Sequence, residues 1–134
     1  MRYLLDTNIC IYLIKQKPPE ILEKFTQYTL DDLAISAMSV AELQFGVQKS
    51  LYPAQNHAAL EQFLLPLNIL DFDYAAAIVY GRIRALLERQ GLPIGAMDLL
   101  IAAQALSANL TIITNNTREF ARVPGLQVSN WLAE

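Results

Sequence analysis

Several short runs of the chain are apolar at consecutive positions, and segments with helical spacing separate them. Such runs are typical of strands buried on both faces of a sheet, because a half-exposed strand would alternate polar and apolar residues. The runs expected to form strands are Arg2–Leu5, Leu33–Ser36, Asn68–Phe72, Leu110–Thr114 and Leu126–Val128. The segments expected to form helices are Ile9–Lys15, Pro19–Tyr28, Ser39–Lys49, Ala54–Leu65, a helix that Asp73 caps and that ends at Arg89, Met97–Ser107 and Thr117–Ala121. Strands that alternate with helices need crossover connections, so the sequence predicts an α/β fold with a central parallel sheet flanked by helices.

The size and composition of the chain limit its class. Its 134 residues are the usual size of one domain, so residues 1–134 are expected to form a single domain. Hydrophobic residues make up 54% and charged residues 17%, which predicts an ordered protein with some apolar surface covered by another chain. The single cysteine, Cys10, excludes an intrachain disulfide and fits the cytoplasm. No signal peptide or membrane span is expected, since Asp6 and Asn8 interrupt the apolar N-terminal run.

Polar side chains follow the predicted strands at their carboxyl ends, where open parallel sheets bind ligands. Asp6 follows the first strand, Glu42 lies one turn into the helix after the second, and Asp98 begins the helix before the last core strand. Three further polar residues follow that strand, namely Asn115, Asn116 and Glu119. Clustered carboxylates repel one another unless a cation binds, and Mg²⁺ prefers such oxygen ligands. A metal of this kind activates water and stabilises charge on a phosphate. A structural zinc site is not expected, because the chain has one cysteine and one histidine.

Each of these residues also has a purely structural interpretation. Asp6 is suited to cap the following helix, and Asp98 to a first helical turn, where the dipole favours an acid. Ser39 and Glu42 have the spacing of a capping box. The pair Asn115–Asn116 fits an ordinary turn, and the acid three residues later fits a solvated helix face. The interpretation as a reactive site therefore depends on the joint placement of these residues.

Four segments carry these positions: LLDTN, SAMSVAEL-x-x-G, PIGAMDLLIAAQA and IITNNTREF. In this order and spacing they resemble the PIN-domain ribonucleases, and more narrowly the VapC toxins of bacterial type II toxin–antitoxin pairs. The resemblance runs from Arg2 to about Trp131 and implies a PIN-like α/β/α sandwich with an endoribonuclease site that depends on Mg²⁺ or Mn²⁺. The catalytic residues that it implies are Asp6, Glu42, Asp98 and Glu119, the first three as metal ligands. The supporting residues that it implies are Thr7, Asn8, Thr114, Asn115 and Asn116.

The resemblance also implies a substrate and partners. The expected substrate is transfer RNA, with the anticodon loop of initiator tRNA favoured because unpaired bases can be read individually. The expected partners are a VapB-like antitoxin and a second copy of the chain, in a homodimer that can join a higher toxin–antitoxin assembly. The residues expected to form an apolar groove for the antitoxin are Ile11, Tyr12, Ile14, Leu43 and Phe45. With a net charge of −3, the grip on RNA must be local, and the residues expected to provide it are Arg82, Arg84, Arg118 and Arg122.

Three alternatives remain open at this point. A phosphotransfer domain of the haloacid-dehalogenase type also begins with a strand and an aspartate, but it needs a second acid where this chain has Asn8. A PIN nuclease that cuts messenger or ribosomal RNA would carry the same motifs. A non-catalytic PIN-like scaffold is the third alternative, because many family members have an aspartate where this chain has Asn116. That amide also favours a single bound metal ion.

Overall fold

The computed structural model describes residues 1–132 and confirms the predicted fold class. Parallel strands form one five-stranded sheet in the order β3-β2-β1-β4-β5. The strands are β1 (Tyr3–Leu5), β2 (Leu33–Ser36), β3 (Asn68–Leu70), β4 (Thr111–Ile113) and β5 (Val128–Ser129). The helices are α1 (Thr7–Lys15), α2 (Pro19–Thr26), α3 (Ala37–Gln48), α4 (Pro53–Leu64), α5 (Tyr74–Arg89), α6 (Ala96–Ser107) and α7 (Thr117–Phe120), with a 3-10 turn η1 (Leu30–Asp32). No helix within residues 1–132 is long and apolar enough to cross a membrane.

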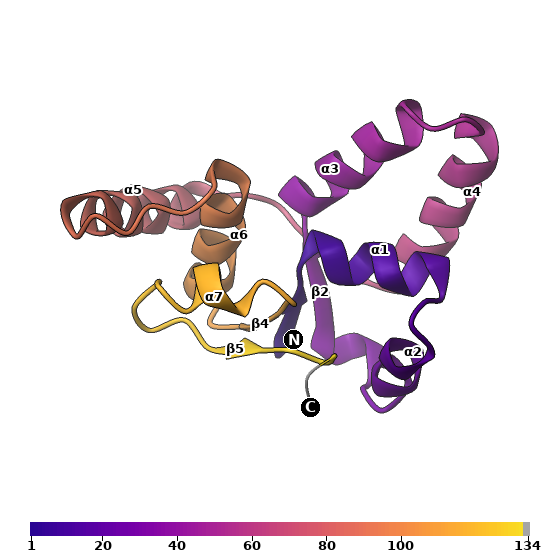
Figure 1. The fold of residues 1–134 in the computed structure, drawn as a ribbon, viewed down its shortest axis with the longest axis horizontal. Coiled ribbons are helices and arrows are strands. Elements are labelled where there is room, and N and C mark those ends of the chain that lie inside the picture. The colour runs from indigo at the N-terminus through magenta and orange to yellow at the C-terminus, as the bar shows by residue number, and fades with distance from the viewer. Residues whose placement is uncertain (133–134) are drawn as a thin grey trace.

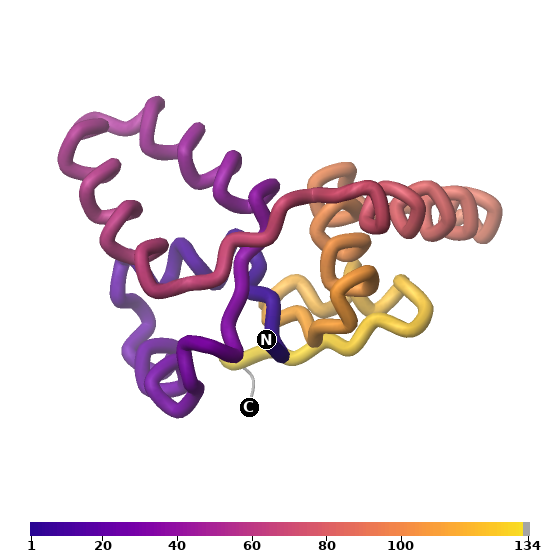
Figure 2. Tube along the Cα trace, turned by 180° about the vertical axis from the view of Figure 1, so that it is seen from behind, coloured from indigo at the N-terminus to yellow at the C-terminus, as the bar shows by residue number. Residues whose placement is uncertain are grey.

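Two hydrophobic cores lie on opposite faces of the sheet. In β1 and β4, Leu5 and Ile113 point into the core that α1 to α4 cover. Their neighbours Leu4 and Ile112 point into the core that α5 to α7 cover. All four side chains are fully buried, which explains why the strands carry apolar residues at consecutive positions. Figure 1 shows the two groups of helices on either side of the sheet, and Figure 2 shows from behind that α5 and the α3–α4 pair extend in opposite directions.

The start of α3 differs from the prediction. The expected capping box at Ser39 and Glu42 is wrong, because Ser36 is the N-cap and its Oγ accepts a hydrogen bond of 3.1 Å from the Met38 amide. Ser36 is also the last residue of β2, so the helix begins as soon as the strand ends. Ser39 is thereby moved from the predicted cap into the first turn of the helix, where its side chain is fully buried.

The direction in which strands are added to the sheet reverses between β1 and β4. The chain adds β2 and β3 on one side of β1 and then places β4 and β5 on the other. In open parallel sheets, ligands bind outside the carboxyl ends of the strands at such a reversal. Asp6 directly follows β1 and Thr114 directly follows β4, so both residues lie at this point. The topology therefore selects the same edge of the sheet as the sequence did.

Candidate active site

Asp6 is the most firmly held carboxylate of the site. Its side chain is only 2% exposed. Its Oδ1 accepts a hydrogen bond of 2.8 Å from the Thr7 amide, and its Oδ2 accepts one of 2.7 Å from the Thr114 hydroxyl. Burial raises the pKa of Asp6 above its usual value, and these two hydrogen bonds offset part of that increase. Asp6 thus acts both as the N-cap of α1 and as a fixed carboxylate at the edge of the sheet.

Glu42 reaches the same edge from the second turn of α3. Its Oε1 lies 2.6 Å from the hydroxyl oxygen of Thr7, the first residue of α1. The Thr7 hydroxyl also lies 3.0 Å from Oγ of Ser39. These contacts join the first turns of α1 and α3 and bring Glu42 near Asp6, whose pKa it helps to raise.

Asp98, Asn116 and Glu119 form the other half of the site. The side-chain amide nitrogen of Asn116 donates to Asp98 Oδ2 at 3.0 Å and to Glu119 Oε2 at 2.9 Å. Burial, a hydrogen bond with Glu119 and repulsion from Asp6, Glu119 and Glu42 raise the pKa of Asp98 to about 7. The hydrogen bonds from Asp98 and Asn116 lower the pKa of Glu119. The two acids therefore titrate as a pair, and protonation of the pair extends to higher pH than for an isolated aspartate.

The electrostatics of the site suit a hard cation. Burial is the main reason that the pKa of Asp98 rises to about 7, and the negative charges of Asp6, Glu119 and Glu42 add to it; a bound cation relieves that repulsion. The donors are oxygen atoms, the ligands that Mg²⁺ prefers. Within residues 1–132, no group of three or more acidic, histidine or cysteine side chains is already placed to hold a metal ion. The residues fit a cation that also takes water or substrate oxygens as ligands, which is the usual manner of Mg²⁺.

The supporting residues fall into two groups. Thr7, Thr114 and Asn116 contact the carboxylates directly. The side chain of Asn8 is exposed and, in the part of the chain that the structure describes, makes no hydrogen bond to an acid. Asn115 donates instead to the Tyr12 hydroxyl at 2.9 Å, which ties the loop after β4 to α1.

The sequence assigns no active-site role to two side chains that lie near the site. Ser39 was assigned to a helix cap, and Tyr12 to an apolar groove. Serine at two positions three residues apart can cap a helix equally well, so the choice between Ser36 and Ser39 is not visible in the local sequence. Tyr12 is spaced along α1 like its apolar neighbours, and only the tertiary structure brings its hydroxyl to Asn115.

The four arginines expected to bind RNA differ in availability. Arg84 is engaged with Glu88 Oε2 at 2.9 Å and with the Tyr80 hydroxyl at 2.8 Å. Arg122 donates to the Pro93 carbonyl at 2.7 Å. The side chains of Arg82 and Arg118 are exposed. Arg118 lies on α7 next to Glu119, so it is the exposed arginine adjacent in sequence to the acids.

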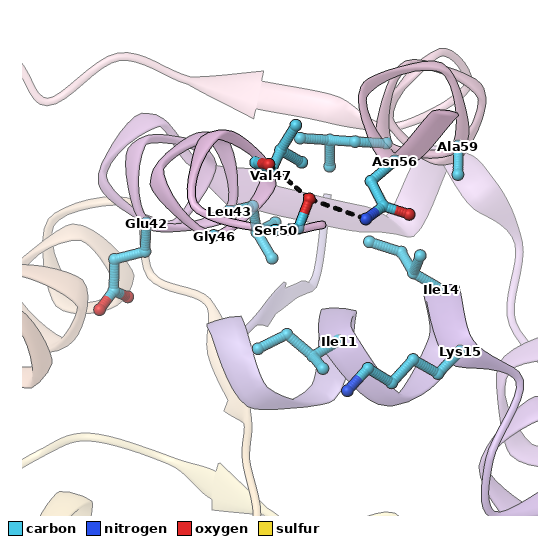
Figure 3. A pocket seen from close by; sticks show the side chains of 11 residues that line it. Ile11, Ile14, Lys15, Glu42, Leu43, Gly46, Val47, Ser50, Asn56 and Ala59 are labelled. Atoms are coloured by element: carbon cyan, nitrogen blue, oxygen red, sulfur yellow. Dashed lines mark hydrogen bonds between the residues drawn. The ribbon is translucent and has the colours of Figure 1, made fainter. Parts of the chain in front are cut away.

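A groove of about 430 Å³ lies between α1, α3 and α4 (Figure 3). Three of the five residues predicted for it line its walls, namely Ile11, Ile14 and Leu43. The other two do not, because Tyr12 turns to Asn115 and Phe45 is 66% exposed. The groove is bounded at one end by Glu42, so it adjoins the acidic cluster.

Comparison with known proteins gives consistent matches over the chain. The model of the PIN domain family matches residues 3–126. The chain is similar to the tRNA(fMet)-specific endonuclease VapC of Salmonella typhimurium, with 45% identity over 131 residues and 98% of each chain covered. It is also similar to solved structures of DNA-bound VapBC from Salmonella typhimurium, with a TM-score of 0.93, 44% identity and 98% of each chain covered. VapBC2 of Rickettsia felis bound to a promoter DNA fragment matches with a TM-score of 0.91, 43% identity and coverage of 98% and 99%.

Proposed function

The chain belongs to the VapC family of PIN-domain ribonucleases, and we propose on that basis that it is a toxin that hydrolyses a phosphodiester bond of initiator tRNA with the help of a divalent cation. The observation that carries the proposal is that Asp98 lies near enough to Asp6, Glu42 and Glu119 for their charges to raise its pKa, with Asp6 at the point where the sheet reverses. Carboxylates from four elements repel one another there, and binding a cation relieves that repulsion.

Asp6, Glu42 and Asp98 are the residues that would hold Mg²⁺ or Mn²⁺. The bound cation would supply an activated water and stabilise negative charge on the phosphate. Thr114 and the Thr7 amide keep Asp6 in place through hydrogen bonds of 2.7 and 2.8 Å. Metal ligands must be deprotonated, so the proton that Asp98 shares with Glu119 has to leave Asp98. Glu119 accepts a hydrogen bond from Asp98, and the pKa of Glu119 is lowered by that bond and by the one from Asn116, so Glu119 stays ionised beside Asp98.

The proposed substrate rests on the relatives and on the charge of the chain. Relatives from Salmonella typhimurium and Shigella flexneri are named as tRNA(fMet)-specific endonucleases and share 45% and 46% of their residues with this chain. With a net charge of −3, binding must use local contacts. Arg118 is exposed and adjoins Glu119 in the sequence, which makes it a candidate contact for a phosphate of the RNA. An anticodon loop presents the unpaired, flexible backbone that such a site requires.

The proposed partners are a VapB-like antitoxin and a second copy of the chain. The antitoxin would place apolar side chains in the groove between Ile11, Ile14 and Leu43. Because Glu42 bounds that groove, a segment seated there reaches the acidic cluster and hinders RNA. Exposed apolar side chains such as Tyr74, which is 81% exposed, provide surface for a homodimer. We place the protein in the cytoplasm, where its substrate occurs.

The proposed activity is tested with the antitoxin-free protein, pooled tRNA and an unstructured RNA, in Mg²⁺, Mn²⁺ or EDTA. Asp98→Asn removes one acid without changing its shape, and Asp31→Asn is the matched control on the exposed η1 turn. We expect discrete fragments of one tRNA with the wild type and the control, and none with Asp98→Asn or EDTA. Cleavage that persists in EDTA contradicts metal dependence. Cleavage of the unstructured RNA alone contradicts tRNA as the substrate. A folded protein that cuts neither RNA favours the non-catalytic PIN-like scaffold.

A further inference from the structure

The side chain of Ser39 is buried at a place where its hydroxyl faces the active site. Its exposed fraction is 0%, and its Oγ lies 3.0 Å from the hydroxyl oxygen of Thr7. Thr7 is itself only 9% exposed and lies 2.6 Å from Glu42 Oε1. The three residues therefore form a continuous line from the interior of α3 to a carboxylate of the site.

The direction of these hydrogen bonds follows from the number of protons. A hydroxyl group has one hydrogen to donate, whereas a carboxylate can only accept. The short contact of 2.6 Å therefore takes the Thr7 proton to Glu42 Oε1. The remaining contact is a hydrogen bond only if Ser39 donates to Thr7 Oγ1, at 3.0 Å. With Ser39 donating to its oxygen, the Thr7 hydroxyl directs its own proton to Glu42.

We propose that Ser39 is a positioning residue for metal binding, whose hydroxyl acts through Thr7 to hold the Glu42 carboxylate with Oε1 engaged and Oε2 left for the cation. This inference rests on the proposed metal-dependent activity. Ser39 touches neither the cation nor RNA. Its hydroxyl fixes the rotation of the Thr7 hydroxyl, and chains of hydrogen bonds of this kind strengthen one another in a buried setting.

The inference is tested by isothermal titration of the RNA-free protein with Mn²⁺, followed by cleavage kinetics. Residues that orient a metal ligand typically change affinity or activity by about 10- to 100-fold when they are removed. We expect Ser39→Ala to weaken Mn²⁺ binding by about tenfold and to lower kcat similarly, with KM for RNA within about twofold of the wild type. Ser39→Thr keeps the hydroxyl and is expected to restore binding. Ser107→Ala is the matched control, because its hydroxyl bonds to the Gln104 carbonyl of its own helix, α6.

A double-mutant cycle separates positioning from general stabilisation. If Ser39 acts through Glu42, Ser39→Ala has no further effect on Mn²⁺ affinity in a Glu42→Ala background. Thr7→Val and Thr7→Ser give a second test, because only the valine variant lacks the hydroxyl. In a Thr7→Val background, Ser39→Ala is likewise expected to have no further effect on Mn²⁺ affinity. Unfolding followed by the single tryptophan, Trp131, verifies that every variant is folded.

The outcomes distinguish this inference from the proposed function. Unchanged Mn²⁺ affinity in folded Ser39→Ala overturns the inference, as does an equal loss in the Glu42→Ala background. A wild type that does not bind Mn²⁺ overturns it as well. If the wild type cuts tRNA while Ser39→Ala behaves like the wild type, only the inference fails. If Mn²⁺ affinity follows the expected pattern but no RNA is cut, the positioning role stands and the proposed nuclease activity fails.

Discussion

The Thr114 hydroxyl is the single contact whose removal should most clearly expose the energetics of the site. It is fully buried, donates to Asp6 Oδ2 at 2.7 Å and accepts from the backbone N–H of Asn116 at 2.9 Å. Thr114→Val keeps the shape of the side chain and removes both hydrogen bonds. A hydrogen bond to a charged group contributes about 1.5–3 kcal/mol, and an amide left without a partner costs about 1–3 kcal/mol when fully buried. Asn116 is half-buried, so water replaces part of the second contribution.

We therefore expect Thr114→Val to lower the free energy of unfolding by about 2–4 kcal/mol, a large part of the ~5–15 kcal/mol typical of a domain. The loss should depend on pH. The Thr114 hydrogen bond lowers the pKa of Asp6, which burial has raised, so it stabilises the ionised form in particular. Removing it costs more where Asp6 is ionised, and the difference from the wild type should be larger at about pH 8 than at about pH 4.

Urea unfolding followed by Trp131 fluorescence measures this difference, since Trp131 is 2% exposed and the chain has a single tryptophan. Thr114→Ser is the matched control, because it keeps the hydroxyl and loses only a methyl group. Its loss of stability should be smaller than that of Thr114→Val and nearly independent of pH. An equal loss in the two variants, or a Thr114→Val loss below about 0.5 kcal/mol, would refute the assignment of the hydrogen bond as the stabilising contact.

Four further perturbations follow from the structure. In urea titrations, Asp98→Asn should become more stable relative to the metal-free wild type as pH rises from about 4 to about 7, because the raised pKa of Asp98 penalises its ionisation in the folded state. A difference in unfolding free energy between the two proteins that stays constant over this range would contradict this. Arg118→Ala should reduce the slope of RNA affinity against salt by about one, while Arg84→Ala, already paired at 2.9 Å, should leave it unchanged; equal slopes would reject the phosphate contact. Gln104→Leu should lower the free energy of unfolding by about 1–3 kcal/mol, because it removes a buried amide that bonds at 3.0 and 3.2 Å, and a stability equal to the wild type would show that these bonds contribute nothing. Gly46→Met should fill the groove without disturbing the fold, since an added Cβ meets no atom within 4 Å. It should weaken antitoxin binding, measured by calorimetric titration, and leave RNA cleavage unchanged. Undiminished antitoxin binding would show that the antitoxin binds elsewhere.

The positions of the strands along the chain were predictable because each carries a local signal. The predicted strand Leu33–Ser36 coincides with β2, and Asp73 caps α5 as expected through its bond of 3.0 Å to the Ala76 amide. The strand ends were less accurate, since β3 ends at Leu70 and not at Phe72. Apolar periodicity shows which residues are buried, but the last hydrogen bond of a strand depends on its neighbour in the sheet.

The placement of acids at one edge was also predictable, because the order of strands and helices determines it. Which atoms bond to one another was not. Glu42 and Thr7 are separated by 35 positions, and Thr114 and Asp6 by 108, so no local rule pairs them. Asn8 shows the converse error, because its neighbours belong to the site while its own side chain is exposed. Adjacent residues of a helix point in different directions, and only one of two neighbours can face the same site.

Asn116 shows how a residue can be located from the sequence while its contacts cannot. From the sequence it counts as a missing charge, a position that offers an amide oxygen where an acid would bind metal. In the structure its nitrogen donates to both Asp98 and Glu119, at 3.0 and 2.9 Å. An aspartate there would remove that donor and add a charge beside Asp98, whose pKa is already about 7. The amide instead holds the two acids together without adding to their repulsion, so its neutrality is compatible with a working site and does not by itself indicate a lost one.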